Sequence, residues 1–442
     1  MTKRTKYLII GNSAGGIGAA EAIREVDGAE AITIVSDEPY PVYSRPLISK
    51  YLARECTFEE ILYRPLDFYA QNHIIFLPGR KVTHVELDQR TAQLEDGEQI
   101  IWEKLLLALG GKPIVPRMKG DNKKGVFTFT TLDDAKAIDR FLDNTRNAVV
   151  IGGGLIGISV TEALVKRGVK VTVVEMKERI LNTMLDQQAS SMAEDVLKQA
   201  GVGIITGHTV VEVSGGEAVQ RVILDNGDAM SCDLVLVAIG VSPRSELALD
   251  AGIKINRGIV TDHQMATNHP NVYACGDVAE AYDFVYGENR LTPVWPNAYI
   301  GGRTAGYNMA GVATEYPGGT AINSLNYFGI DITSAGMPTP PNDDGYEVIS
   351  KQEGSIYRKV ILKDDCVRGM IFVGDIEKSG IVFGLMRDKV KVGGFKQMLL
   401  ADDFGLAFLP QALWRERLMP PPETVLQAIP PVEAEEEAFA GE

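Results

Sequence analysis

Two similar glycine-rich segments decide the expected fold. Residues 7–20 read YLIIGNSAGGIGAA, and residues 148–157 read AVVIGGGLIG. In each segment an apolar run leads into glycines and then into a stretch with helical patterning, and a second apolar run follows at residues 31–35 and 170–174. A strand, a glycine-rich turn, a helix and a second strand form a βαβ unit with a parallel sheet. The sequence therefore predicts an α/β protein with two dinucleotide-binding domains.

The second segment fits the dinucleotide fingerprint G-x-G-x-x-G. Gly152 permits the tight turn, Gly154 lets a pyrophosphate approach the backbone, and Gly157 lets the helix pack closely on the strand. The start of the helix adds amides and partial positive charge. Glu175 ends the next strand, where a carboxylate binds the ribose 2′-hydroxyl of NAD and repels the 2′-phosphate of NADP. The segment therefore predicts an NAD(H) site.

The first segment departs from this fingerprint because Ser13 stands where the second glycine is expected. Serine is small, so a phosphate can still approach. Residues 11–15 also match G-x-S-x-G, the nucleophile elbow of hydrolases, but an elbow needs earlier strands to place it, and only about ten residues precede Ser13. A hydrolase is therefore disfavoured. Asp37 and Glu38 both follow the strand at residues 31–35, and either can reach the ribose of the first cofactor.

The two segments are parts of a repeat at the scale of whole domains. Each is followed by β-rich patterning and by a similar apolar strand, and from about residue 316 the pattern changes to short strands, turns and a helical end. A proline-rich and acidic stretch closes the chain and predicts an extended tail. The expected parts are a first domain in two pieces (1–117 and 247–318), a second domain (118–246), a smaller α+β domain (319–419) and the tail (420–442).

Composition removes several classes of function. With Lys+Arg 44 against Asp+Glu 59, the net charge is −15, which repels nucleic acid. The four cysteines are scattered, so a disulfide framework, a zinc site or an iron–sulfur cluster on the chain is disfavoured, and no metal site is expected. No signal peptide and no apolar run of membrane-spanning length occur, which predicts a cytoplasmic protein without membrane insertion.

Further motifs resemble the pyridine nucleotide-disulfide oxidoreductase superfamily. Residues 267–277, TNHPNVYACGD, are similar to its second FAD motif, in which Asp277 would bind the ribityl or pyrophosphate portion. Residues 107–110 and 237–240 resemble the strand ends of its two cofactor domains. The resemblance covers nearly the whole chain. It implies two Rossmann-like domains, for FAD and NAD, and a C-terminal α+β interface domain.

Two shorter motifs narrow the resemblance to NADH-dependent reductases of rubredoxin, ferredoxin or larger iron–sulfur complexes. Residues 43–50, YSRPLISK, would bring Arg45 and Lys50 to the flavin, with Lys50 as the catalytic candidate. Residues 295–298, WPNA, resemble a helix start that faces the flavin. The FAD candidates are Gly11, Ser13, Ala14, Gly15, Gly16, Asp37, Glu38, Arg45, Lys50, Val82, Ala108, Gly110, Gly276, Asp277, Trp295, Asn297 and Ala298. The NAD(H) candidates are Gly152, Gly154, Leu155, Ile156, Gly157, Glu175 and Gly240.

Two departures from the family pattern bear on mechanism. Residues 42–50 contain no cysteine, although the thiol-dependent members need one against the flavin, and this disfavours thiol chemistry. Ser159 stands where relatives often carry a glutamate that pairs with the flavin-site lysine. Without that partner, the cation of Lys50 could lie near the flavin and favour its anionic reduced form.

The resemblance implies hydride exchange between NAD(H) and FAD, coupled to single-electron exchange with an iron–sulfur protein. We expect that partner to be a separate protein or a subunit of a larger oxidoreductase, such as the aldehyde or phenylglyoxylate type, in a hetero-oligomer. A basic cluster at the end of the chain could meet an acidic carrier: Arg387, Lys389, Lys391 and Lys396. The alternatives are a stand-alone NADH oxidase, an NADH:rubredoxin reductase and a non-enzymatic flavoprotein that senses NADH.

Overall fold

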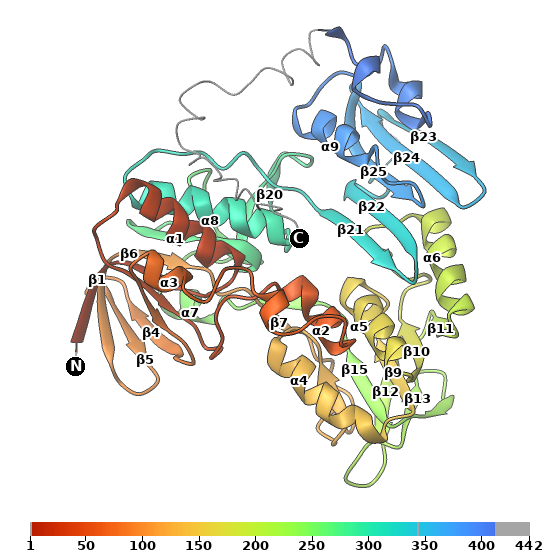
Figure 1. The fold of residues 1–442 in the computed structure, drawn as a ribbon, viewed down its shortest axis with the longest axis horizontal. Coiled ribbons are helices and arrows are strands. Elements are labelled where there is room, and N and C mark those ends of the chain that lie inside the picture. The colour runs from red at the N-terminus through yellow and green to blue at the C-terminus, as the bar shows by residue number, and fades with distance from the viewer. Residues whose placement is uncertain (1, 343, 412–442) are drawn as a thin grey trace, which may run out of the picture.

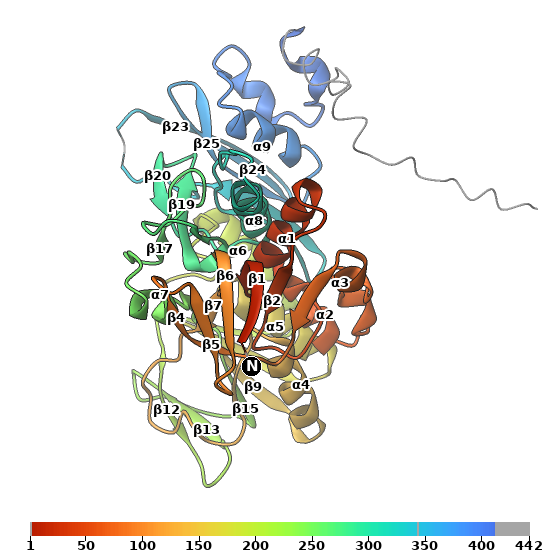
Figure 2. The same ribbon diagram turned by 90° about the vertical axis from the view of Figure 1, so that its left-hand side faces the viewer.

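A computed structural model describes residues 2–342 and 344–411, so the expected tail at residues 420–442 lies outside the described residues. Figure 1 shows a first α/β unit on the left, a second at the lower right and a C-terminal unit at the upper right. The first unit consists of two chain segments, one before and one after the second unit. Strand β18 joins the sheet that contains β1, and α8 packs on α1. Figure 2 gives the view turned by 90°.

The first unit is built on a seven-stranded sheet in the order β3-β2-β1-β6-β5-β4, with β18 pairing β6. Strands β2, β1, β6 and β18 run parallel, as the first glycine-rich segment predicts. The elements are β1 (Thr2–Ile10), α1 (Ala14–Val26), β2 (Ile32–Val35), α2 (Ile48–Leu52), α3 (Phe68–Gln71), β3 (Ile74–Leu77), β4 (Val82–Glu86), β5 (Thr91–Leu94), β6 (Gln99–Leu107), β18 (Val272–Ala274) and α8 (Trp295–Met309).

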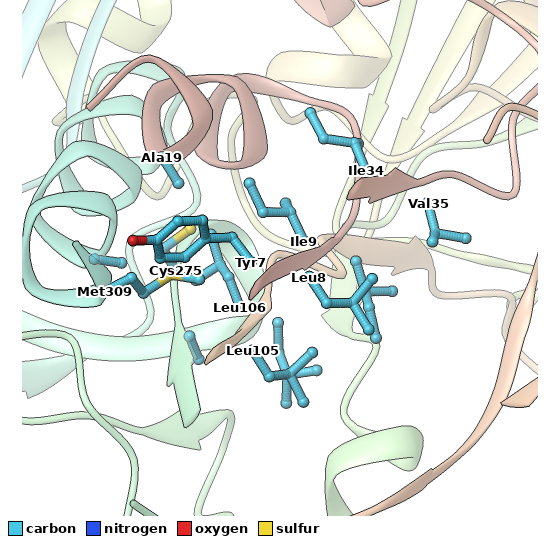
Figure 3. Close-up of a cluster of buried hydrophobic side chains, with 14 of the residues drawn as sticks. Tyr7, Leu8, Ile9, Ala19, Ile34, Val35, Leu105, Leu106, Cys275 and Met309 are labelled. Atoms are coloured by element: carbon cyan, nitrogen blue, oxygen red, sulfur yellow. The ribbon is translucent and has the colours of Figure 1, made fainter. Parts of the chain in front are cut away.

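The core of this unit covers both faces of the sheet, and the helix pair α1 and α8 packs over one of them (Figure 3). Leu8 and Ile9 from β1 and Leu105 from β6 are completely buried. Tyr7 is also buried, and its hydroxyl donates a hydrogen bond to Asp27 over 2.9 Å. Burial of such aliphatic side chains stabilises a fold by about 1.5–3 kcal/mol each, so the strands that carry the glycine turn are held rigidly.

Glycines allow α1 and α8 to pack with their backbones almost in contact. A Cβ on Gly302 would lie 2.0 Å from the carbonyl oxygen of Gly15, and a Cβ on Gly306 would lie 2.4 Å from that of Ala19. Because α8 follows α1 by more than 250 residues, this contact joins the two sequence pieces of the first unit.

The second unit repeats the plan with a five-stranded parallel sheet in the order β11-β10-β9-β15-β8. A three-stranded antiparallel sheet, β12-β13-β14, packs beside it. The elements are β8 (Val126–Thr128), α4 (Leu132–Phe141), β9 (Asn147–Ile151), α5 (Leu155–Lys166), β10 (Lys170–Glu175), α6 (Gln187–Gln199), β11 (Gly203–Thr206), β12 (Val210–Ser214), β13 (Arg221–Leu224), β14 (Ala229–Ser231) and β15 (Leu234–Val237).

Two connections link these units. The strands β7 (Gly111–Pro113) and β16 (Val241–Pro243) pair where the chain crosses between the units. The remaining elements are α7 (Glu246–Asp250), β17 (Ile259–Val260), β19 (Ala279–Asp283) and β20 (Glu288–Arg290), with 3₁₀ turns η1 (Arg45–Leu47), η2 (Glu59–Ile61), η3 (Leu142–Asn144), η4 (Gly276–Val278), η5 (Lys396–Leu400) and η6 (Leu406–Phe408).

The C-terminal unit is an antiparallel sheet in the order β21-β22-β25-β24-β23, with α9 packed on β25. A buried carboxylate fastens it to the second unit: Asp186, the N-cap of α6, accepts hydrogen bonds from Tyr357 over 2.7 Å and from Lys359 over 2.8 Å. The elements are β21 (Ile322–Tyr327), β22 (Ile330–Gly336), β23 (Tyr346–Glu353), β24 (Ile356–Lys363), β25 (Cys366–Val373) and α9 (Ser379–Arg387).

The boundaries expected at residues 117, 246 and 318 fall between β7 and β8, at the start of α7 and just before β21. They stay predictions. Within the described part of the chain, no helix combines the length and the apolar character that crossing a bilayer requires.

Candidate functional site

A cleft of about 630 Å³ lies where the three units meet. Its walls come from the turns after β1, β2 and β6, from the starts of α1, α5 and α8, and from β21. Three helix N-termini thus open into one cavity. Because each N-terminus carries unpaired amides and partial positive charge, the cleft suits anionic groups such as pyrophosphates.

The first glycine turn forms one end of this wall. Gly11 has φ +119°, and a Cβ there would lie 2.1 Å from the Ala108 carbonyl oxygen; a Cβ on Gly16 would lie 2.0 Å from that of Gly11. Both glycines are therefore required by the turn itself. Ser13 lines the cleft at the N-cap of α1, and its hydroxyl makes no capping hydrogen bond. That hydroxyl is available to a phosphate.

In the second turn, the fold requires glycine at positions 152 and 157 but not at position 154. Gly152 has φ +107° and Gly157 packs against the Gly152 carbonyl, as a fingerprint turn requires. Gly154, however, has an ordinary backbone conformation (φ −80°, ψ −173°), and a Cβ there would have no neighbour within 4 Å. The space beside Gly154 is open to a pyrophosphate, which is what the NAD(H) interpretation demands.

Glu175 is held rigidly beside that turn. Its carboxylate accepts hydrogen bonds from the Gly153 amide over 2.7 Å and from the Lys177 amide over 2.8 Å, and the residue is buried. Each carboxylate oxygen can accept a second hydrogen bond, so a ribose hydroxyl fits beside these amides. Gly152, Gly154, Gly157, Glu175 and Gly240 lie outside the cleft lining, whereas Leu155 and Ile156 belong to it.

Asp37 and Glu38 have different surroundings in the structure. Glu38 accepts a hydrogen bond from the Tyr43 hydroxyl over 2.5 Å and forms an ion pair with Arg45, so it fixes Arg45 in the wall. Asp37 forms an ion pair with Arg244 over 2.8 Å. Arg244 follows β16, so this pair links the first unit to the connection leading out of the second.

Asp277 is a partly buried carboxyl group that lacks hydrogen-bond donors among the described residues. It lines the cleft and makes no hydrogen bond with any other described residue. Burial raises its pKa above the ordinary value, and the nearby charge of Arg45 offsets this only in part. A ligand that donates hydrogen bonds, such as the hydroxyls of a ribityl chain, would satisfy this carboxylate. The residues present therefore fit FAD.

Replacing the carboxylate of Asp277 by an amide should change the stability of the apoprotein and its affinity for FAD in opposite directions. A raised folded pKa means that ionisation of this group opposes folding at neutral pH; the cost begins to decrease as the pH falls through the raised value and is absent below the ordinary pKa. We therefore expect Asp277→Asn to raise the thermal midpoint of the apoprotein at pH 7 while weakening FAD binding by about tenfold, because charged hydrogen bonds contribute about 1.5–3 kcal/mol. Flavin titration of the apoprotein measures the affinity. A less stable apoprotein with unchanged affinity would contradict this role.

The remaining FAD candidates divide between the cleft and its surroundings. Trp295 lines the cleft and packs edge-on against Tyr63, with ring centroids 5.1 Å apart. Asn297 instead donates a hydrogen bond to the Thr320 carbonyl over 3.1 Å. Val82 is buried in β4. Other candidates in the lining are Gly11, Ser13, Ala14, Gly15, Asp37, Glu38, Arg45, Ala108, Gly110, Gly276, Asp277 and Ala298; Gly16, Lys50, Val82 and Asn297 are not.

Lys50 is exposed on α2 and does not line the cleft. Its charge acts on the thiol of Cys56, whose pKa burial nevertheless raises. A position beside the flavin stays a prediction for Lys50. If its cation favours the anionic reduced flavin, Lys50→Met lowers the flavin midpoint potential, measured by anaerobic redox titration. An unchanged potential would remove Lys50 from the site.

The cysteines do not supply a reactive thiolate in the cleft. Cys275 lines it, but burial raises the pKa of this thiol to about 12, so it is protonated at neutral pH. Cys232 is buried in the second unit, where burial likewise raises its pKa to about 12. Thiolate is the nucleophilic form of cysteine, so nucleophilic thiol chemistry is disfavoured.

Comparison with known proteins identifies the family. The profile of the pyridine nucleotide-disulphide oxidoreductases matches residues 5–319, and that of the rubredoxin NAD+ reductase C-terminal domain matches residues 322–390. The chain belongs to the pyridine nucleotide-disulphide oxidoreductase family. It is accordingly an FAD-dependent NAD(H) oxidoreductase, and the resemblance and fold expected from the sequence are confirmed.

Three similar proteins are named as a dehydrogenase subunit or as reductases. The epsilon subunit of an NADH-dependent phenylglyoxylate dehydrogenase from Aromatoleum evansii is 32% identical over 90% of this chain and 96% of its own. A rubredoxin-NAD(+) reductase of Pseudomonas putida is 30% identical over 70% of this chain and 81% of its own. The reductase in a covalent putidaredoxin reductase–putidaredoxin complex superposes with a TM-score of 0.81 at 26% identity, covering 88% of this chain and 94% of its own.

Arg244 and Tyr327 are among the cleft-lining residues that could not be recognised from the sequence. Arg244 reaches the cleft from the connection after β16, and Tyr327 reaches it from the C-terminal unit. No local motif marks either residue, because each arrives through contacts between units that are distant in sequence.

Proposed function

We propose that this protein is the NAD-linked electron-transfer subunit of a larger oxidoreductase, exchanging electrons with an iron–sulfur partner. The first glycine turn, Arg45 and Asp277 hold FAD, and the second glycine turn and Glu175 hold NAD(H). When bound, FAD exchanges a hydride with NAD(H) and single electrons with a one-electron partner. The chain's own groups bind and orient the two cofactors, so catalysis rests on positioning.

One observation carries this proposal: a single cleft runs from the first glycine turn to the start of α5, directly after the second glycine turn, without a reactive thiolate in its wall. The start of α1 and Asp277 line it from the first unit, and Leu155 and Ile156 line it from the second. The start of α8 also faces it, so amides at Trp295 and its neighbours can stabilise negative charge on reduced flavin. Electrons that enter from NADH therefore need an acceptor outside the chain.

The names of the relatives support an iron–sulfur partner. One relative is a subunit of an NADH-dependent dehydrogenase, one is named for rubredoxin, and one structure holds a reductase bound to putidaredoxin.

The basic cluster contributes less charge than its sequence suggests: Arg387 pairs with Asp388, and Lys396 pairs with Glu347 over 2.6 Å. None of its four residues lines the cleft.

Anaerobic stopped-flow kinetics test the electron acceptor. The FAD-loaded protein is reduced with one equivalent of NADH and then mixed with an oxidised ferredoxin, with rubredoxin or with dissolved oxygen. We expect an iron–sulfur or iron–thiolate acceptor to reoxidise the flavin at least tenfold faster than oxygen does. Faster reoxidation by oxygen than by either iron protein would favour an NADH oxidase instead.

A further inference from the structure

The C-terminal unit reaches the second glycine turn through the β21–β22 hairpin. Tyr327, the last residue of β21, places its hydroxyl 3.5 Å from the Leu155 carbonyl oxygen, and the Phe328 amide donates a hydrogen bond to Glu162 over 2.9 Å. Leu155 and Glu162 both belong to α5, the helix that follows the second glycine turn. The hairpin therefore forms part of the wall on the NAD side.

Tyr327 and Ser159 are neighbouring hydroxyl groups in that part of the wall. Both line the cleft, and the Tyr327 hydroxyl lies within hydrogen-bonding reach of the Ser159 side chain. Burial raises the pKa of Tyr327 to about 12, so the phenol is neutral at physiological pH. A hydroxyl can donate one hydrogen bond and accept two, so both groups keep capacity to bind a polar group of a ligand.

Several other residues of the cleft lining are apolar or already paired. Phe129, Leu155, Ile156 and Leu325 present apolar side chains. The neighbouring Thr130 hydroxyl donates to Asp134 over 3.2 Å, and its carbonyl accepts from Arg45 over 2.9 Å. Beside these apolar side chains, the spare hydrogen-bonding capacity of the two hydroxyls marks a place where a polar group of a ligand fits.

We propose that Tyr327 and Ser159 bind the carboxamide of the nicotinamide ring, so that the C-terminal unit contributes directly to the NAD(H) site. The carboxamide carries one acceptor and two donors, and two hydroxyl groups can meet both kinds. This inference rests on the proposed placing of NAD(H) at the second glycine turn. It assigns Tyr327 and Ser159 a positioning role: they orient the ring for hydride exchange, and no proton moves to or from them.

Ligand binding to the oxidised, FAD-loaded protein tests whether Tyr327 and Ser159 bind the carboxamide or only support the fold. Calorimetric titrations use NAD+ and ADP-ribose, which lacks the nicotinamide ring. We expect Tyr327→Phe and Ser159→Ala each to weaken NAD+ binding about five- to tenfold, as loss of one hydrogen bond predicts, and to leave ADP-ribose binding unchanged. Tyr346→Phe removes a hydroxyl from the same unit outside the cleft and is the matched control.

Each outcome of the titrations decides the matter. Loss of NAD+ affinity alone supports the proposal. Equal losses for both ligands, or no loss for either, overturn it, since a carboxamide contact cannot affect ADP-ribose. Gly154→Leu tests whether NAD(H) binds at the second glycine turn. If Gly154→Leu lowers the affinities for NAD+ and ADP-ribose while Tyr327→Phe changes neither affinity, only the carboxamide role fails. If Gly154→Leu leaves both affinities unchanged, the proposed NAD(H) site fails and the carboxamide role fails with it.

Discussion

Gly154→Leu abolishes reduction of the flavin by NADH and leaves the fold and the bound FAD intact. The backbone of Gly154 is in an ordinary extended conformation, and a side chain there meets no protein atom within 4 Å. A leucine side chain instead fills the space through which a pyrophosphate approaches the helix start. We expect NAD+ affinity to fall at least 100-fold, which corresponds to about 2.8 kcal/mol, while the free energy of unfolding changes by about 1 kcal/mol or less.

A matched variant controls for the side chain itself. Gly216 lies in the loop between β12 and β13 of the same unit, and a Cβ there also meets nothing within 4 Å. Gly216→Leu should leave NAD+ affinity unchanged. Calorimetric titration and thermal denaturation compare the two variants. Normal NAD+ affinity in Gly154→Leu would show that this turn does not bind the dinucleotide.

Gly302→Ala destabilises the first unit severely and causes loss of FAD. The added Cβ would lie 2.0 Å from the carbonyl oxygen of Gly15 and 2.8 Å from its Cα, and both belong to the backbone of α1. Backbone cannot rotate away as a side chain can, so α1 and α8 must separate. We expect a loss of about 3 kcal/mol or more, the upper range for overpacking. Because α1 begins at the first glycine turn, the FAD content falls as well.

The neighbouring residue offers a control that adds the same methyl group. A Cβ on Gly301 would lie 3.2 Å from Cε of Met265, the flexible end of a side chain. Gly301→Ala also raises helix propensity by about 1 kcal/mol, so this variant should keep its FAD and nearly all of its stability. The measurements are the thermal midpoint and the FAD bound per chain. Equal behaviour of the two variants would contradict the close backbone contact between α1 and α8.

The features that could be predicted from the sequence are local ones. The spacing of Gly152, Gly154 and Gly157 fixes a turn within six residues, and Glu175 follows at the end of the next strand. Such a motif specifies its own geometry, so the parallel sheets of both α/β units could be predicted. The resemblance added Asp277, which lies in the cleft just after β18.

The features that could not be predicted depend on how distant segments meet. Tyr327 approaches α5 across 172 residues, and Arg244 pairs with Asp37 across 207. Neither lies in a local pattern, since only the docking of one unit on another brings them together. Lys50 lies in a local motif, but its position relative to the cleft still could not be predicted. The direction of an exposed lysine side chain on α2 depends on its rotamer and its neighbours.

We propose that this chain works as the NAD-linked subunit of an iron–sulfur assembly. The most direct test is to isolate, without oxygen and from its own cells, the species that contains the chain, and to measure its native mass and iron content. We expect an assembly that is larger than a homodimer, contains iron and is reduced by NADH through FAD. An iron-free monomer or homodimer would contradict the subunit role and would make the protein a stand-alone reductase.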